Sequence, residues 1–341
     1  MRTMAIMITG ALRTTPTKAL LTILNWLPPD ILAKQIAAQT AVRLKANKAW
    51  NKYHYGHAKI LGIVNWNKEV DYVTPGPTFD PSFQVEIPDE TYYDNGLLIP
   101  DDTIAIFTDG SKTRESAGCG IYSEQLNLRL SFKLPCYSSV LQAEIMAIKL
   151  AAEWIQYHEI LHRNIHILTD SKAAINSLVN VYTTSKIVQE CRASLEEIAR
   201  HSSVTLIWVP GHRDIDGNCR ADMLASAGTT LDRIGPNCDI GVSLTTCKQL
   251  ISHNLYNKAT ARWRSESTCS ESRKIWPNMD GQRSKQLLKL PRIHIRNLIG
   301  VITGHWVIGR HAQRLLLPYN DFCRSCNDEE EEESTEHLLC H

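Results

Sequence analysis

Two aspartates stand at the ends of short apolar runs that have the composition of buried strands. Asp109 closes the run IAIFTD, and Asp170 closes the run IHILTD. If these strands are neighbours, the two carboxylates meet in one crevice, because sites in α/β folds gather at the carboxyl ends of strands. Two further acids, Glu144 in LQAE and Asp222 in NCRADMLA, stand among apolar residues of helical patterns. The four acids are therefore candidates for a single site.

Such a cluster points to metal-dependent chemistry. Four converging carboxylates repel one another strongly, so the cluster is stable mainly when divalent cations neutralise it. Hard oxygen ligands suit Mg²⁺ or Mn²⁺. A pair of these ions can activate a water on one side of a phosphodiester and stabilise the leaving oxygen on the other, without a protein nucleophile. His212, in the turn VPGHRDIDGN, would then be placed to shuttle protons or to assist product release.

Taken singly, each residue also fits an ordinary role. Asp109-Gly110 could form a turn, and Asp170-Ser171 could form a helix N-cap. Glu144 could stand on the rim of its helix, and the histidine could be an ordinary loop residue. The joint order and spacing of the four acids favours the metal site over these alternatives.

The elements that would position the acids can be read from the apolar periodicity between residues 104 and 229. The pattern predicts strands at 104–109, at two places within 119–134 around a turn at 124–127, at 165–170 and at 204–210, and helices at 140–158, 171–180, 186–200 and 216–229. The order β-β-β-α-β-α-α-β-α indicates an α/β fold in which helices pack on a mixed sheet.

Four segments stand in the order found in a type 1 ribonuclease H domain, namely TDGS, QAEIMAI, LTDSKAAI and WVPGHRDIDGNCRAD. The part of the chain at 103–230 resembles that family. The resemblance implies a ribonuclease H-like fold with a five-stranded mixed sheet flanked by helices. It also implies endonucleolytic cleavage of the RNA strand of RNA–DNA hybrids by two-metal-ion hydrolysis.

The resemblance assigns roles to individual residues. Asp109 would bridge two Mg²⁺ (or Mn²⁺) ions, Glu144 and Asp170 would complete one of them, and Asp222 would complete the other. His212 would be the mobile loop histidine. The residues that match positions close to the hybrid backbone in the family are Gly110, Ser111 and Asn218.

The chain departs from the family pattern at two places. Cys219 stands where many relatives carry Glu, but this position is not one of the metal acids. Between residues 180 and 204 there is no basic helix insertion, which some members use as a substrate handle. The grip on a hybrid would therefore have to come from elsewhere in the chain.

The charge pattern indicates where that grip lies. The formal net charge is only +1, from 37 Lys+Arg against 36 Asp+Glu, but the charges fall into blocks of opposite sign. The expected regions are a basic helical region at 1–68, an acidic proline-rich linker or extended wrap at 69–102, the ribonuclease H domain at 103–230, a basic and partly helical region at 231–320, and an acidic tail at 321–341. Because phosphate contacts supply most of the affinity for nucleic acids, the two basic blocks are the candidates for holding the hybrid.

The flanks have a resemblance of their own. Residues 8–44 resemble the region after the reverse transcriptase domain of non-LTR retrotransposon polyproteins, and VITGHWVIGRHAQRLLLPYNDFCRSC resembles the region after ribonuclease H in those elements. This implies the C-terminal part of such a polyprotein. There is no Tyr-x-Asp-Asp or Ala-Asp-Asp motif, so reverse transcription by this chain alone is not expected. Apolar residues such as Leu21, Ile23 and Trp26 predict that the first region packs poorly without a polymerase domain.

The tail carries a possible zinc knuckle. Its pattern is Cys323-x2-Cys326-x10-His337-x2-Cys340, a set of four ligands at spacings that a structural Zn²⁺ site can use. The alternative is an acidic tail with incidental cysteines. The acidic run at 328–333 would repel phosphate, so a knuckle here supports nucleic-acid contact only indirectly.

Other classes of protein are disfavoured. No apolar run approaches the roughly 18 residues of a membrane helix. Ten cysteines in 341 residues are fewer than a disulfide scaffold has, so we expect an intracellular, non-secreted protein of the nucleus or cytoplasm. Two functional alternatives remain, a catalytically silent nucleic-acid-binding remnant of a retroelement and a DNA-cutting relative of the wider superfamily. The oligomeric state is left open.

Overall fold

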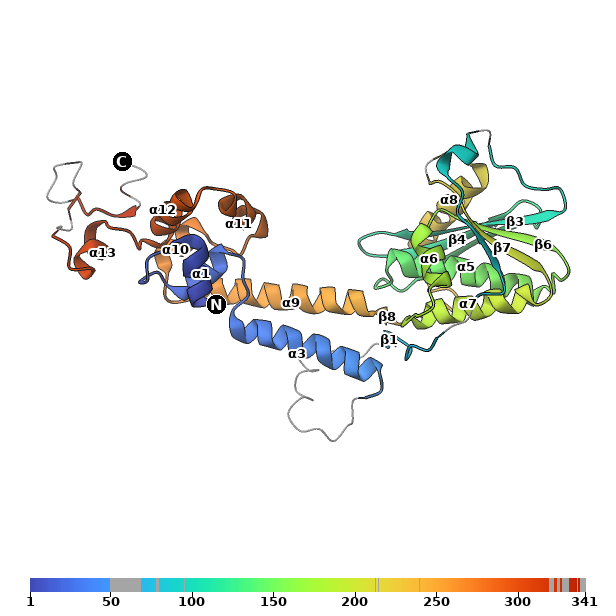
Figure 1. Cartoon of the computed structure of the whole chain (residues 1–341), viewed down its shortest axis with the longest axis horizontal. Helices are drawn as coiled ribbons and strands as arrows, with labels where there is room; N and C mark the ends of the chain where they lie inside the picture. Colours follow the sequence, from blue (N-terminus) through green and yellow to red (C-terminus); the bar gives the residue numbers. More distant parts are fainter. Residues whose placement is uncertain are drawn as a thin grey trace. The chain divides into compact units, whose positions relative to one another are not determined.

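The structure is a computed structural model whose parts are drawn in Figure 1. It describes residues 1–49, 69–77, 80–94, 96–211, 213, 215–238, 240–318, 322–323, 326, 331–335 and 337. The chain divides into two compact units. We call Met1–Ala38 with Leu250–His341 the helical unit, and Gln39–Gln249 the sheet unit.

The sheet unit is built on a mixed six-stranded sheet with the order β2-β7-β6-β3-β4-β5. Its strands are β2 (Gln84–Glu86), β3 (Thr103–Lys112), β4 (Ala117–Ser123), β5 (Leu128–Leu134), β6 (Asn164–Thr169) and β7 (Ser203–Trp208). The pairs β2–β7, β7–β6 and β6–β3 are parallel, whereas β3–β4 and β4–β5 are antiparallel. The five predicted strands and the mixed sheet are thus confirmed.

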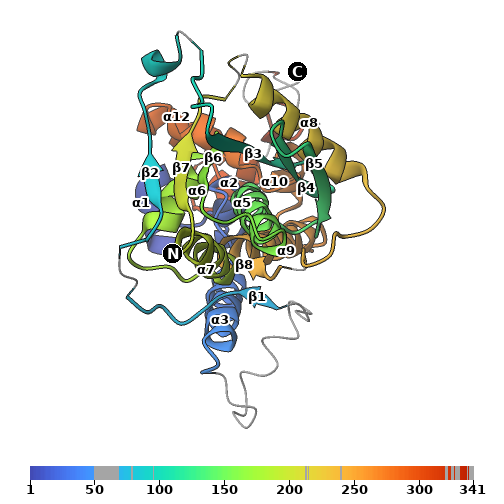
Figure 2. The ribbon, with the colours of Figure 1, turned by 90° about the vertical axis from the view of Figure 1, so that its right-hand side faces the viewer.

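Helices cover both faces of this sheet. They are α5 (Val140–Tyr157), α6 (Lys172–Val179), α7 (Lys186–Ala199) and α8 (Asp216–Thr230), as predicted. Figure 2 shows α8 on one side of the sheet and α5 with α7 on the other. The apolar face of α5 is completely buried against β3 and β4, because Ile145, Ile148 and Ala152 recur at helical spacing.

Glycines let α8 lie unusually close to the sheet. A Cβ atom at Gly120 would stand 2.3 Å from the backbone oxygen of Ala221, and one at Gly118 would stand 2.6 Å from that of Ala225. Such distances exclude any side chain at these two positions of β4. The sequence of β4 therefore determines how close α8, which carries Asp222, comes to β3 and β4.

The region predicted as a linker or extended wrap packs on the sheet unit. Its elements are β1 (Val70–Asp71), β2 and the 3₁₀ helix η2 (Glu90–Tyr93). β1 pairs in parallel with β8 (Val242–Ser243), and the sixth strand, β2, covers the edge of β7, as Figure 2 shows. Prolines interrupt any period here, so the strands are short, but Phe83 and Tyr93 are buried in the core.

The helical unit joins the two ends of the sequence. Its elements are α1 (Arg2–Thr9), α2 (Thr17–Ile23), α10 (Ser270–Ile275), α11 (Gly281–Leu288), α12 (Arg292–Thr303) and α13 (Gly309–Arg314), while α3 (Pro29–Ala46) and α9 (Leu244–Arg264) contribute residues to both units. Ile23 is fully buried in one apolar cluster with Trp276 and Ile299. The prediction that Leu21, Ile23 and Trp26 pack poorly is therefore wrong, because residues beyond 250 supply their partners.

Crossing a bilayer requires a helix that is both long and apolar. In the part of the chain that the structure describes, no helix combines the necessary length with the necessary apolar character.

Candidate active site

Two neighbouring parallel strands deliver the first two acids. Thr108 of β3 is in register with Thr169 of β6, so Asp109 and Asp170 come next on adjacent strands. Glu144 lies in the second turn of α5, and the three side chains each offer an oxygen within 4.8 Å of the others. We call Asp109, Glu144 and Asp170 the acid cluster. The structure thus brings together three of the four predicted acids.

The α5 end of the cluster is fixed by a capping box. Ser139 precedes α5, and its hydroxyl accepts a 3.2 Å hydrogen bond from the backbone N–H of Gln142. In return the backbone N–H of Ser139 donates to Gln142 Oε1 at 3.0 Å. This reciprocal cap defines where the helix begins. Glu144 comes two residues after Gln142.

Burial and mutual repulsion make the acid cluster electrostatically costly. Asp109 and Glu144 are each only 6% exposed, and Asp170 is half-buried. Burial, and then the charges of Asp170 and Asp222, raise the pKa of Asp109 to about 7. Burial, and then the charges of Asp109 and Asp170, raise the pKa of Glu144 to about 9. The ionised carboxylates therefore repel one another unless a cation neutralises them.

One oxygen of the cluster has no partner. Glu144 Oε2 is buried and accepts no hydrogen bond from the described residues. Leaving a buried carboxylate oxygen without a hydrogen-bond partner is unfavourable, and an oxygen in this situation suits a metal ligand.

Gly110 allows the strand and the helix to meet at this point. A Cβ atom there would stand 2.3 Å from the backbone nitrogen of Glu144 and 2.6 Å from the carbonyl carbon of Ala143. The backbone of Gly110 also hydrogen-bonds the carboxylates of Asp109 and Glu144, which lowers their pKa values against the larger effect of burial. Gly110 therefore shapes the acid cluster, and its predicted contact with a hybrid remains a prediction.

Asp222 lies outside the group of three. It is exposed in the second turn of α8, and its oxygens do not belong to the 4.8 Å group among the described residues. Its charge nevertheless contributes to the raised pKa values of both Asp109 and Glu144. Asp222 is thus an electrostatic neighbour of the acid cluster.

Two of the remaining predicted site residues, Ser111 and Asn218, lie in the described part of the chain. His212 lies outside it, but the preceding Gly211 lies beside Asp170, because a Cβ atom at Gly211 would stand 2.9 Å from Asp170 Oδ2. Ser111 is half-buried, with its hydroxyl 3.5 Å from that of Ser226 on α8. Asn218 is 4% exposed, and its Oδ1 has no partner among the described residues.

The structure adds contacts to this loop that sequence reasoning missed. Arg213, next to His212, donates to Asp94 Oδ1 at 2.7 Å and to the carbonyl of Glu90 at 3.2 Å. Both partners lie in or directly after η2, in the segment predicted as a linker. The hydroxyl of Tyr93 donates to the carbonyl of Trp208, whose indole N–H donates to the carbonyl of Asp170 at 3.0 Å. The aromatic residues Phe83 and Tyr93 are the sequence signal that could have indicated that this segment packs against the core.

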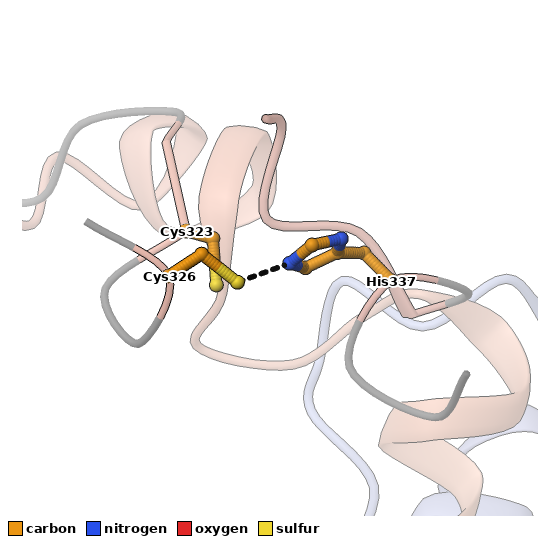
Figure 3. A group of neighbouring side chains, drawn as sticks. All are labelled: Cys323, Cys326 and His337. Atoms are coloured by element: carbon orange, nitrogen blue, oxygen red, sulfur yellow. Dashed lines mark hydrogen bonds between the residues drawn. The ribbon is translucent and has the colours of Figure 1, made fainter. Parts of the chain in front are cut away.

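A second group of potential ligands lies in the tail. Figure 3 shows Cys323, Cys326 and His337 facing one another, with one ligand atom of each within 4.8 Å of the others. Cys326 Sγ lies 3.0 Å from His337 Nε2, and His337 Nδ1 lies 3.6 Å from Glu331 Oε2. We call Cys323, Cys326 and His337 the tail cluster. The predicted fourth ligand, Cys340, lies outside the described residues.

Comparison with known protein families bears on the acid cluster. The RNase H family model matches residues 101–230, a segment that includes β3 to β7 and α5 to α8 and all of the acid cluster. The chain therefore contains an RNase H domain.

Proposed function

We propose that the chain cleaves the RNA strand of RNA–DNA hybrids endonucleolytically at the acid cluster. One observation carries the proposal: within an RNase H domain, three buried or half-buried carboxylates converge to within 4.8 Å. Converging carboxylates of this kind can bind the divalent cations that assist phosphodiester hydrolysis.

The residues of the acid cluster fit a divalent cation. They offer only hard oxygen ligands, which suit Mg²⁺ or Mn²⁺, and Glu144 Oε2 is a buried acceptor without a described partner. Asp109, Glu144 and Asp170 would hold one ion, and Asp109 with Asp222 would hold a second. When bound, the ions would supply an activated water and stabilise the leaving oxygen.

The other residues act on the substrate or on protons. His212 would carry protons to or from the reacting groups, because histidine titrates near neutral pH. On either side of it in the sequence, Gly211 lies beside Asp170 and Arg213 pairs with Asp94. Gly110, Ser111 and Asn218 would contact the hybrid backbone.

The wider context of the activity is also a proposal. The flanks resemble those of non-LTR retrotransposon polyproteins, so we infer that the nuclease acts within such an element on hybrids made during its replication. The grip on the hybrid would come from the basic blocks at 1–68 and 231–320.

We further infer that the tail cluster binds a structural Zn²⁺, with Cys340 as the fourth ligand. Two thiols and an imidazole suit Zn²⁺. The carboxylate of Glu331, 3.6 Å from His337 Nδ1, is the kind of partner that orients a zinc-bound histidine through its other ring nitrogen.

The decisive experiment presents the purified full chain, with Mg²⁺, with labelled RNA–DNA hybrid, double-stranded RNA and double-stranded DNA side by side. We expect internal cuts in the RNA strand of the hybrid alone, and none by Asp109→Asn. Cleavage of the DNA duplex would instead indicate the DNA-cutting alternative. If the wild-type protein leaves the hybrid intact and only binds it, salt-sensitively and equally well as Asp109→Asn, it is the catalytically silent remnant.

A further inference from the structure

A buried carboxylate outside the acid cluster joins three parts of the sheet unit. Asp71, in β1, is 6% exposed. Its Oδ2 accepts hydrogen bonds from Gln142 Nε2 at 3.0 Å and from the hydroxyl of Ser185 at 2.6 Å. Its Oδ1 accepts one from the backbone N–H of Ile187 at 3.0 Å. Asp71 therefore ties the start of α5 to the start of α7.

Gln142 is the member of this network nearest to the acid cluster. Its Oε1 completes the capping box with Ser139, and its Nε2 donates both to Asp71 and to the carbonyl of Gly241, the latter at 2.9 Å. Together these contacts use both ends of the amide and fix the first turn of α5. Glu144 is two residues further along the same helix, and one of its oxygens has no described partner.

Both anchors of Gln142 lie outside the segment that matches the RNase H family. Asp71 precedes residue 101, and Gly241 comes after residue 230. They are held together by the pairing of β1 with β8, and a Cβ atom at Gly241 would stand 2.5 Å from the backbone nitrogen of Asp71. The two flanks thus form one small platform under the beginning of α5.

We propose that Asp71 and Gln142 form a positioning clamp that holds Glu144 ready to bind a metal ion, so that the functional nuclease unit extends to β1 and β8. The inference rests on the proposed function, because it assigns Glu144 to a metal. Neither residue touches the reacting atoms. They act by restricting the helix that presents the carboxylate, and partners of this kind change metal affinity more than they change chemistry at saturating metal.

Ser185 offers a matched control. Its hydroxyl donates to the same oxygen of Asp71 as Gln142 does, but from the N-cap of α7. Ser185→Ala therefore removes a hydrogen bond to the same buried carboxylate without touching α5. A residue that merely stabilises the fold would behave like Ser185, whereas a positioning residue would not.

The experiment compares Gln142→Met, Asp71→Asn and Ser185→Ala in the full chain. Methionine keeps the length of the side chain but makes neither hydrogen bond to the platform. Asp71→Asn leaves the capping box of α5 intact and replaces one of the two acceptor oxygens by an NH2 group, so that the hydrogen bonds from Gln142, Ser185 and Ile187 cannot all be kept. The readouts are Mn²⁺ binding without substrate, the Mg²⁺ concentration that gives half of the maximal cleavage rate, the rate at saturating Mg²⁺, and the thermal midpoint.

We expect Gln142→Met and Asp71→Asn to weaken Mn²⁺ binding and to raise the half-maximal Mg²⁺ concentration roughly 10-fold, the lower end of the effect of losing a partner that orients a ligand. Saturating Mg²⁺ should restore most of the rate. Ser185→Ala should lower the thermal midpoint but shift the metal requirement by less than about twofold, well below the effect of losing a partner that orients a ligand, because both hydrogen bonds of Gln142 Nε2 stay in place.

Equal shifts for the Gln142 and Ser185 variants, or no shift for either, would overturn the clamp. If either Gln142→Met or Asp71→Asn does not fold, the metal binding of the other variant tests the clamp. Mn²⁺ binding needs no substrate, so this test separates the clamp from the proposed activity. A wild-type chain that binds Mn²⁺ but cuts nothing would refute the activity and leave the clamp testable by binding. A wild-type chain that binds no Mn²⁺ would refute the clamp.

Discussion

The acid cluster and the tail cluster each bring three potential metal ligands together, but they are built in different ways. In each, three ligand atoms lie within 4.8 Å of one another. The acid cluster draws its members from β3, α5 and the end of β6, which are far apart in sequence. The tail cluster lies within residues 323–337. The described contacts of this segment include an isolated bridge between Phe322 and Glu332 and a 2.8 Å hydrogen bond from the backbone N–H of Gly309 to Glu333 Oε2, and Cys323 and His337 are 5% and 8% exposed.

The two clusters therefore differ in what positions their side chains. The sheet and α5 bring like charges together, so the fold itself positions the acid cluster, at a cost in stability. The tail cluster is drawn from one short segment rather than from distant elements, so a metal bound there would contribute to how that segment folds. The acid cluster, in contrast, is positioned by the sheet and α5.

The largest expected effect separates the two clusters by activity. Glu144→Gln should lower the single-turnover rate of hybrid cleavage roughly 10³-fold, because a metal ligand of this kind is worth several kcal/mol of transition-state stabilisation. Its zinc content, measured by atomic emission, should equal that of the wild type. A variant that loses zinc together with activity would mean that the two clusters are not independent.

The converse substitution is in the tail. Cys326→Ser should lower the Zn²⁺ affinity by at least about 100-fold, the upper cost of losing a residue that only hydrogen-bonds a ligand. Competition with a chromophoric chelator measures this. Cleavage of a short hybrid at saturating protein should change little, and a loss as large as that of Glu144→Gln would contradict the comparison.

A third test asks whether packing holds the acid cluster. Gly110→Ala should lower the free energy of unfolding of the sheet unit by roughly 1–3 kcal/mol, because overpacking forces neighbours apart, and the new Cβ would stand 2.3 Å from the backbone nitrogen of Glu144. Urea denaturation measures it. Gly76→Ala is the control, since nothing lies within 4 Å of a Cβ at that position, and it should stay within about 0.5 kcal/mol.

The smallest effect concerns the cost of the acid cluster without metal. The pKa of Asp109 is raised to about 7, so its charged form destabilises the fold. Stability is lost as the pH rises above the ordinary pKa near 4, and the loss from Asp109 is complete above about 7. In EDTA at pH 8, Asp109→Asn should therefore be more stable than the wild type by roughly 1–2 kcal/mol. At pH 4 the two should unfold alike, and equal stability at both pH values would refute the repulsion.

The two clusters also differ in what the sequence could predict. Cys323 and Cys326 could be predicted from their spacing, and Asp109 and Asp170 from the apolar runs that precede them, because these signals are local. The strand β3 itself continues past Asp109 to Lys112. Asp71, Gln142 and the pairing of Arg213 with Asp94 were not predicted. They depend on a proline-interrupted segment whose elements form only by pairing with distant strands.

The prediction that the first region packs poorly was wrong for the same reason. The partners of Ile23 lie more than two hundred residues later in the chain, in α10 to α12. An apolar residue near the beginning of a sequence gives no sign of such a partner. Periodicity identifies elements, but it does not say which of them meet.

The division of the helical unit has a consequence for synthesis. Its first part, Met1–Ala38, leaves the ribosome before the sheet unit, and its second part, Leu250–His341, leaves afterwards. Domains generally fold as units while the chain is being made, at about 5–20 residues per second. At that rate the apolar residues of α1 and α2 are made roughly 10–50 seconds before α10 to α12 emerge. During translation this segment is a natural client for chaperones.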